Sequence, residues 1–91
     1  MVIARRYLIA GRVQGIGFRF FTYDAAEREG IQGWVRNLPD RRVEVLAEGD
    51  AEAMMRFEIA IRRGPAGARV DEVEVDVVAP VRTFLGFSVR G

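Results

Sequence analysis

Hydrophobic and polar residues alternate with a period of two over five stretches of the chain. This period places successive side chains on opposite faces of an extended backbone, so it predicts strands. In the first stretch, Tyr7 and Ile9 share one face, and Leu8 and Ala10 share the other. The predicted strands are residues 5–12, 31–38, 42–48, 69–78 and 83–90.

A helical period marks residues 19–29, with Gly30 as the expected end of the helix. Apolar and small residues three and four positions apart predict the side that faces the core, namely Phe21, Ala25 and Ala26. Aromatic residues are usually buried, so we also expect Phe20, Phe21 and Tyr23 in or near the core.

A second helix is predicted between Asp50, a suitable N-terminal cap, and Gly64-Pro65, which would end it. The apolar positions of this segment follow the i, i+3, i+4, i+7 rule closely. They are Ala53, Met54, Phe57, Ala60 and Ile61.

The elements follow one another as β-α-β-β-α-β, with one further strand at the end. This order predicts an α+β fold of the ferredoxin-like βαββαβ type, an antiparallel sheet with both helices on one face and an extra C-terminal strand. The strand–helix–strand crossover makes the first two strands run in the same direction. Their C-terminal ends then lie at one edge of the sheet, which places Asn37 on the same side as Arg19.

A glycine-rich loop joins the first strand to the first helix. Gly11, Gly15 and Gly17 let the backbone turn its N–H groups inward, and a helix N-terminus adds free donors and a partial positive charge. Arg19 adds a permanent charge in a planar fork that fits phosphate oxygens. The spacing favours an anion-binding loop, although glycine-rich turns also occur for structural reasons alone.

Asn37 is the only asparagine of the chain and stands near the end of the second strand. One interpretation is structural, because Asn before a turn commonly bonds to its own backbone. The other interpretation is functional: the Asn37 amide takes part in binding at the anion-binding loop, which the topology brings near it.

Composition narrows the chemistry. The 91 residues predict a single domain spanning 1–91, and the chain contains no Cys, no His and no Lys. Thiolate nucleophiles, Schiff bases and the usual general base are therefore excluded.

The net charge of +1 argues against a nucleic-acid binder. No apolar run reaches the length of a membrane span, and the N-terminus has no secretory pattern, so we expect a cytoplasmic monomer.

Two blocks of sequence resemble the acylphosphatase family. They are Gly11-Arg12-Val13-Gln14-Gly15-Ile16-Gly17-Phe18-Arg19 and Gly33-Trp34-Val35-Arg36-Asn37, and the resemblance covers about residues 5 to 90. It implies a small metal-independent enzyme without cofactors that hydrolyses the carboxyl–phosphate bond of a small-molecule acyl phosphate. It also implies that Asn37 positions the attacking water. The implied phosphate-binding groups are Arg19 and the backbone N–H groups of Gln14, Gly15, Ile16, Gly17, Phe18 and Arg19.

The chemistry agrees with this resemblance. An acyl phosphate carries a good carboxylate leaving group, so catalysis depends mainly on positioning and on stabilising the equatorial oxygens. Neither block contains a carboxylate, and we therefore expect an oxygen of the substrate's own phosphate to take the proton of the water.

Two residues depart from the family pattern. Ile16 stands where valine is common, a difference of one methylene that the loop should tolerate. Arg41 stands where the hairpin turn often has glycine. Arg41 would be strained there if the turn requires a positive φ.

Two other functions fit parts of the pattern. An RNA-recognition module has the same element order, but its aromatic residues lie on the third strand, and residues 42–48 contain none. A non-catalytic anion-binding or regulatory domain would keep the same loop, and turnover of an acyl phosphate distinguishes it from an enzyme.

Overall fold

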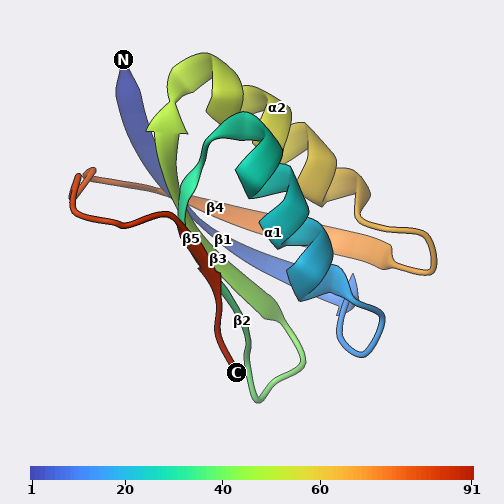
Figure 1. Ribbon diagram of the computed structural model, residues 1–91. Coiled ribbons are helices and arrows are strands. Elements are labelled where there is room, and N and C mark those ends of the chain that lie inside the picture. Colours follow the sequence, from blue (N-terminus) through green and yellow to red (C-terminus); the bar gives the residue numbers. More distant parts are fainter.

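Two helices lie on one face of a five-stranded sheet in the computed structural model, which describes residues 1–91 (Figure 1). Neither helix has the length and apolar character needed to cross a membrane. The elements are β1 (Val2–Arg12), α1 (Phe18–Glu29), β2 (Gln32–Asn37), β3 (Val43–Asp50), α2 (Ala51–Arg63), β4 (Arg69–Val78) and β5 (Phe87–Val89).

The strands are ordered β4-β1-β3-β2-β5 across the sheet. The first four are antiparallel to their neighbours, as the ferredoxin-like order predicts, whereas β5 pairs with β2 in parallel, so the whole sheet is mixed. Since β1 and β2 are both antiparallel to β3, they run in the same direction. Their C-terminal ends lie at one edge of the sheet, where the candidate site forms.

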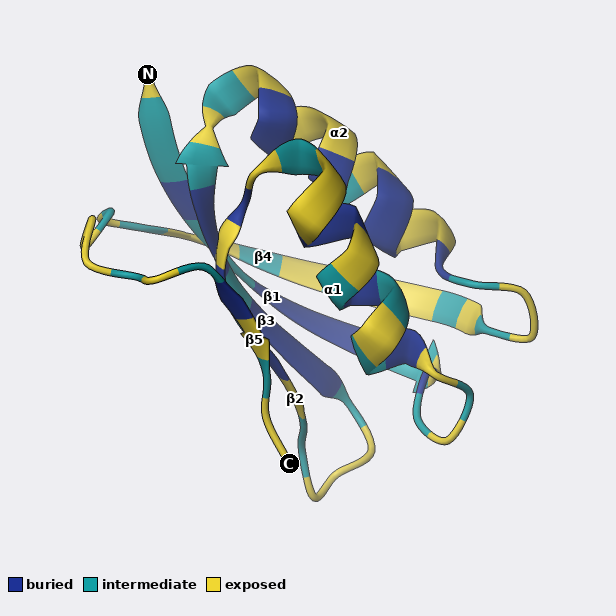
Figure 2. Ribbon diagram, in the orientation of Figure 1, coloured by how far each residue is buried: buried dark blue, intermediate teal, exposed yellow.

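The core lies between the sheet and the two helices, whose buried sides face the strands (Figure 2). All five apolar positions predicted for α2 are buried, and Asp50 caps this helix by accepting a hydrogen bond from the N–H of Glu52. On β1 and β3 the inward residues are fully buried, and they include Tyr7, Ile9, Val43, Val45 and Ala47.

The buried side of α1 differs in part from the sequence prediction. Its buried residues are Phe18, Thr22, Ala25 and Ala26. Phe20 is 62% exposed, so the expectation of core packing was wrong for this residue. The helix begins at Phe18, and a side chain two positions later points roughly 200° away around the axis. Burial of Phe18 therefore turns Phe20 outward, while Phe21 and Tyr23 pack against the core edge.

The last strand is shorter than predicted, because β5 covers only Phe87–Val89 of residues 83–90. Leu85, which strand alternation would place on the same face as the buried Phe87, is fully exposed. The buried carboxylate of Glu48 accepts hydrogen bonds from the N–H groups of Val81 (2.7 Å) and Arg82 (2.8 Å). These bonds hold the segment before β5 as a loop rather than a strand.

The sheet face opposite the helices carries a buried carboxylate. Glu44 is only 3% exposed, and it accepts hydrogen bonds of 2.6 Å from Nε of Arg6 and of 2.6 Å from Nε of Arg36. The two arginines lie on the strands that flank β3. A buried acid is tolerated here because two cations compensate its charge.

Candidate active site

The loop between β1 and α1 presents a row of free backbone N–H groups. Gly15 and Gly17 adopt positive φ values of 78° and 80°, which turn the backbone in a way that side chains disfavour. Gly17 caps α1 without any side-chain hydrogen bond, and the first helical bond runs from the N–H of Phe21 to the carbonyl of Gly17. The N–H groups of residues 14–20 therefore have no acceptor within the protein.

Space around the two glycines is open. A Cβ atom added at Gly15 or at Gly17 would meet no other atom within 4 Å. Glycine is thus required at these positions by the backbone angle rather than by crowding. The loop leaves room for a ligand above its N–H groups, which is the arrangement that anions prefer at a helix N-terminus.

Arg19 lies in the first turn of α1. Its Nη1 donates a hydrogen bond of 2.6 Å to the carbonyl oxygen of Arg90, just beyond β5. This is its one hydrogen bond within the protein, so Nε and Nη2 remain available as donors. A guanidinium held by one nitrogen keeps the two-donor edge that matches a pair of phosphate oxygens.

Asn37, the last residue of β2, faces the same space. A pocket of about 100 Å³ is lined by Val13, Gly15, Gly17, Phe18, Arg19, Phe20 and Asn37. The Asn37 Oδ1 atom is buried and has no hydrogen-bond partner. An unpaired buried polar atom costs about 1–3 kcal/mol, so its presence beside free N–H groups indicates a position for a polar ligand or water.

Gln14 joins this loop to the hairpin that carries Asn37. Its Nε2 donates hydrogen bonds to the carbonyl oxygens of Leu38 (2.9 Å) and Arg42 (2.9 Å). The amide nitrogen of Gln14 is therefore engaged in fixing the loop, and the donor that Gln14 offers a ligand is its backbone N–H. Ile16 likewise presents its N–H, while its side chain packs against the core.

The structure brings most of the predicted site residues together. Gly15, Gly17, Phe18, Arg19 and Asn37 line one pocket, and Gln14 and Ile16 take part only through the loop backbone. Sequence reasoning missed three contributors, namely Val13, Phe20 and the carbonyl of Arg90. The helical period would have turned Phe20 toward solvent had Phe18 been assigned to the core, whereas a backbone carbonyl leaves no signature in a sequence.

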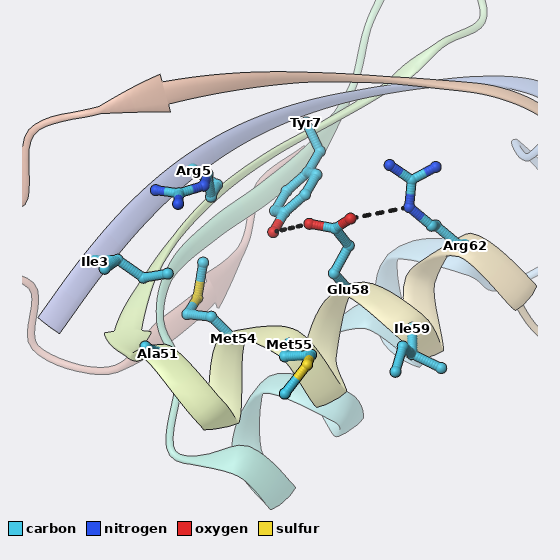
Figure 3. A pocket seen from close by; sticks show the side chains of 9 residues that line it. All are labelled: Ile3, Arg5, Tyr7, Ala51, Met54, Met55, Glu58, Ile59 and Arg62. Atoms are coloured by element: carbon cyan, nitrogen blue, oxygen red, sulfur yellow. Dashed lines mark hydrogen bonds and ion pairs between the residues drawn. The ribbon is translucent and has the colours of Figure 1, made fainter. Parts of the chain in front are cut away.

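A larger cavity lies elsewhere, between β1 and α2, with a volume of about 250 Å³ (Figure 3). Three of its polar side chains bond to one another. The Tyr7 hydroxyl donates to Glu58 (3.1 Å), which also accepts from Arg62 (3.0 Å), as Figure 3 shows. Burial, together with the Glu58 charge, raises the pKa of Tyr7 above its ordinary value, so the hydroxyl stays protonated. This cavity has no row of free N–H donors like that at the glycine loop.

The fold and the pocket together define a small α+β domain with a cation and free backbone donors at the start of its first helix. The family model described as acylphosphatase matches residues 5–89. The chain belongs to the acylphosphatase family, and its activity is that of an acylphosphatase, which hydrolyses the carboxyl–phosphate bond of acyl phosphates.

Relatives of similar length support this assignment. An acylphosphatase of Koribacter versatilis is 47% identical over 87 residues, which are 96% of this chain and 79% of that protein. One of Pseudomonas paraeruginosa is 52% identical over 82 residues, covering 90% of this chain and 89% of that protein. The crystal structure of acylphosphatase from Bacillus subtilis superposes with a TM-score of 0.94 at 35% identity and covers both chains fully.

The same domain also occurs within larger proteins. The crystal structure of full-length HypF in the phosphate- and nucleotide-bound form matches with a TM-score of 0.87 and 28% identity. The match covers all of this chain but only 12% of that one.

Proposed function

We propose that the pocket at the N-terminus of α1 holds the phosphoryl group of the substrate. The N–H groups of residues 14–19 and the free edge of the Arg19 guanidinium would surround its oxygens. The absence of any protein acceptor for these N–H groups supports this role, and so does the lack of a carboxylate paired with Arg19. Donors fixed in this way stabilise charge that develops on the phosphoryl oxygens.

Asn37 positions the attacking water in this proposal. The observation that carries it is the buried, unpaired Oδ1 of Asn37 in the pocket that Arg19 also lines. An amide oxygen there accepts a hydrogen bond from water and holds the water oxygen beside the bound phosphoryl group. Fixed placement of the nucleophile removes the entropic cost of a bimolecular encounter.

The proposed reaction is a single displacement. The water oxygen forms a bond to phosphorus, and the bond between phosphorus and the acyl oxygen breaks. The electron pair leaves with the carboxylate, and an oxygen of the substrate's phosphate takes the proton from the water. The products are a carboxylate and inorganic phosphate. No Asp or Glu lines the pocket, which supports the substrate as the proton acceptor.

We further propose that hydrolysis needs no metal and that the protein works as a cytoplasmic monomer without nucleic-acid or membrane partners. The chain offers no His or Cys, and no cluster of three or more potential metal ligands forms in the structure. The near-neutral net charge of +1 gives little attraction for nucleic acid. Hydrolysis should therefore continue unchanged in a chelator, and light scattering should give the monomer mass of 10.2 kDa.

The test of the site is hydrolysis of an aromatic acyl phosphate, followed by ultraviolet absorbance, in Arg19→Ala and Asn37→Ala. Each variant should lose on the order of 100-fold in kcat/KM, by analogy with removal of one stabilising donor, while the fold persists. Arg28→Ala, at the exposed far end of the same helix, is the matched control and should keep full activity. Full activity in either site variant would refute the residue roles.

The proton route has its own test. Across the pH range where the substrate keeps its charge, the rate should show no titration of an enzyme carboxylate. A single Asp or Glu substitution that abolishes activity and removes an acid limb from the pH–rate profile would contradict proton transfer to the substrate.

A further inference from the structure

We propose that Trp34 positions Arg19 for phosphate binding, acting through Arg90 across the edge of the sheet. This inference rests on the proposed phosphate-binding role of Arg19. Trp34 itself does not line the pocket, so its effect would be indirect.

Arg90 connects the two residues, because each of its parts has a different partner. Its carbonyl oxygen accepts the 2.6 Å hydrogen bond from Nη1 of Arg19. Its N–H donates to the carbonyl of Val35 at 2.8 Å, and its guanidinium carbon lies 4.5 Å from the centre of the Trp34 ring. The residue that holds Arg19 is thus held in turn by β2, once through its backbone and once through its side chain.

Trp34 is well fixed for such a role. It lies on β2 beside Val35, which is fully buried, so alternation places Trp34 on the sheet face opposite the helices. The guanidinium carbon of Arg36 also lies over the ring, 5.1 Å from its centre. Arg36 donates at 2.6 Å to Glu44, and that carboxylate is buried in the sheet. A continuous set of contacts therefore runs from Glu44 through Arg36, Trp34 and Arg90 to Arg19.

Arg90 needs this support because β5 ends one residue earlier, at Val89, and is only three residues long. Beyond the strand, the Arg90 carbonyl is fixed by a single backbone hydrogen bond and by the stacking of its side chain on Trp34. Loss of the ring would free Arg90, and Arg19 would sample more orientations before binding phosphate. A cation–aromatic contact at an exposed site corresponds to about a two- to fivefold change in an equilibrium constant.

The experiment titrates inorganic phosphate and follows the backbone amide NMR signals of residues 14–19, which report affinity and folding together. In Trp34→Ala, the dissociation constant should rise about two- to fivefold, and KM for the acyl phosphate should rise by a similar factor. Trp34→Phe keeps an aromatic face and should recover most of the affinity. Leu8→Ala is the control for lost packing, because Leu8 is a buried residue of β1, which β3 separates from β2 in the sheet.

A second set of variants tests whether the effect passes through Arg90 and Arg19. Arg90→Ala keeps the carbonyl but loses the stacked side chain, so it should match Trp34→Ala, and the double variant should be no worse than either. In an Arg19→Ala background, Trp34→Ala should have no further effect on phosphate affinity.

The outcomes separate the two proposals. If Arg19→Ala binds phosphate as tightly as the parent protein, the role of Arg19 fails and this inference fails with it. If Arg19→Ala loses affinity while Trp34→Ala does not, or if Trp34→Ala weakens phosphate equally in both backgrounds, the positioning role of Trp34 alone is overturned.

Discussion

Gln14 donates a hydrogen bond of 2.9 Å to the carbonyl of Leu38, the residue that follows Asn37. The same amide nitrogen donates at 2.9 Å to the carbonyl of Arg42 across the hairpin turn. One side chain thus joins the loop that carries the free N–H groups to the strand end that carries Asn37. The separation between the proposed phosphate donors and the proposed water site depends on this bridge.

Gln14→Glu should damage both stability and activity. The substitution keeps the size of the side chain but replaces the two N–H donors with a carboxylate that faces two carbonyl oxygens. We expect a loss of roughly 1–3 kcal/mol in the free energy of unfolding. Because the loop and Asn37 would separate, kcat/KM should fall about tenfold or more. Urea denaturation and acyl phosphate hydrolysis measure the two effects.

Thr83→Glu is the control for the added charge, since Thr83 is exposed in the loop before β5. It should leave both quantities nearly unchanged. Parent-like activity in Gln14→Glu would show that the bridge does not set the geometry of the site.

Arg19→Lys tests the fork geometry separately from the charge. Lysine keeps the positive charge but lacks the planar two-donor edge, and one of its donors would still be drawn to the Arg90 carbonyl. We expect kcat/KM to fall by at least about tenfold, toward the loss on the order of 100-fold expected for Arg19→Ala. The same exchange at Arg28, in the last turn of α1, should change nothing. A fully active Arg19→Lys enzyme would mean that charge alone suffices.

The sequence predicted α2 well because its five inward residues follow a single helical period and Asp50 caps it. It predicted α1 less well, since three aromatic residues at 18, 20 and 21 can each be assigned to the core when only local spacing is known. The choice of Phe18 depends on the tertiary fold, in which this ring packs with the core while Phe20 lines the pocket.

The location of the candidate site could be predicted from chain order, because β1 and β2 run in the same direction and bring Arg19 and Asn37 to one edge of the sheet. The hydrogen bonds that hold the site residues in place could not be predicted. The Gln14 side chain bonds to carbonyls 24 and 28 residues away, and the Arg19 side chain to one 71 residues away. Any residue has a carbonyl, so residue identity carries no information about these acceptors. The burial of Glu44 could not be predicted either. Strand alternation indicates the sheet face on which Glu44 lies, but it does not show that Arg6 and Arg36 pair with its carboxylate there.

Arg41→Gly should stabilise the protein. The hairpin turn does require a positive φ at this position, because Arg41 adopts 76°, a value that side chains disfavour. Glycine removes this local strain, but its greater conformational freedom in the unfolded chain offsets part of the gain. We expect the free energy of unfolding to rise by about 0.5–1 kcal/mol. Arg41→Ala retains the Cβ atom and should show no such gain. Thermal and urea unfolding measure the difference, and a glycine variant no more stable than the alanine variant would contradict the strain.

Glu44 should make stability depend on acid pH. Burial alone would raise the pKa of Glu44, but hydrogen bonds from Arg36 and Arg6 outweigh burial and hold the pKa below its usual value of 4.5. A carboxyl whose pKa is lower in the folded protein stabilises the fold above its unfolded pKa. This contribution is lost as pH falls through the folded pKa.

Glu44→Gln removes that contribution at every pH and leaves two cations beside a neutral amide. At pH 7 we expect this variant to be less stable by about 1–2 kcal/mol, a moderate value because both arginines are partly exposed and hydrated. The difference from the parent should shrink below a pH of about 4.5 and approach zero once Glu44 is protonated in the folded state. Exposed acids such as Asp40 and Asp71 also have lowered pKa values, but both proteins share them, so their effects cancel. Urea unfolding of the pair from pH 7 to 3 provides the measurement, and a difference that stays constant with pH would show that Glu44 does not contribute through its charge.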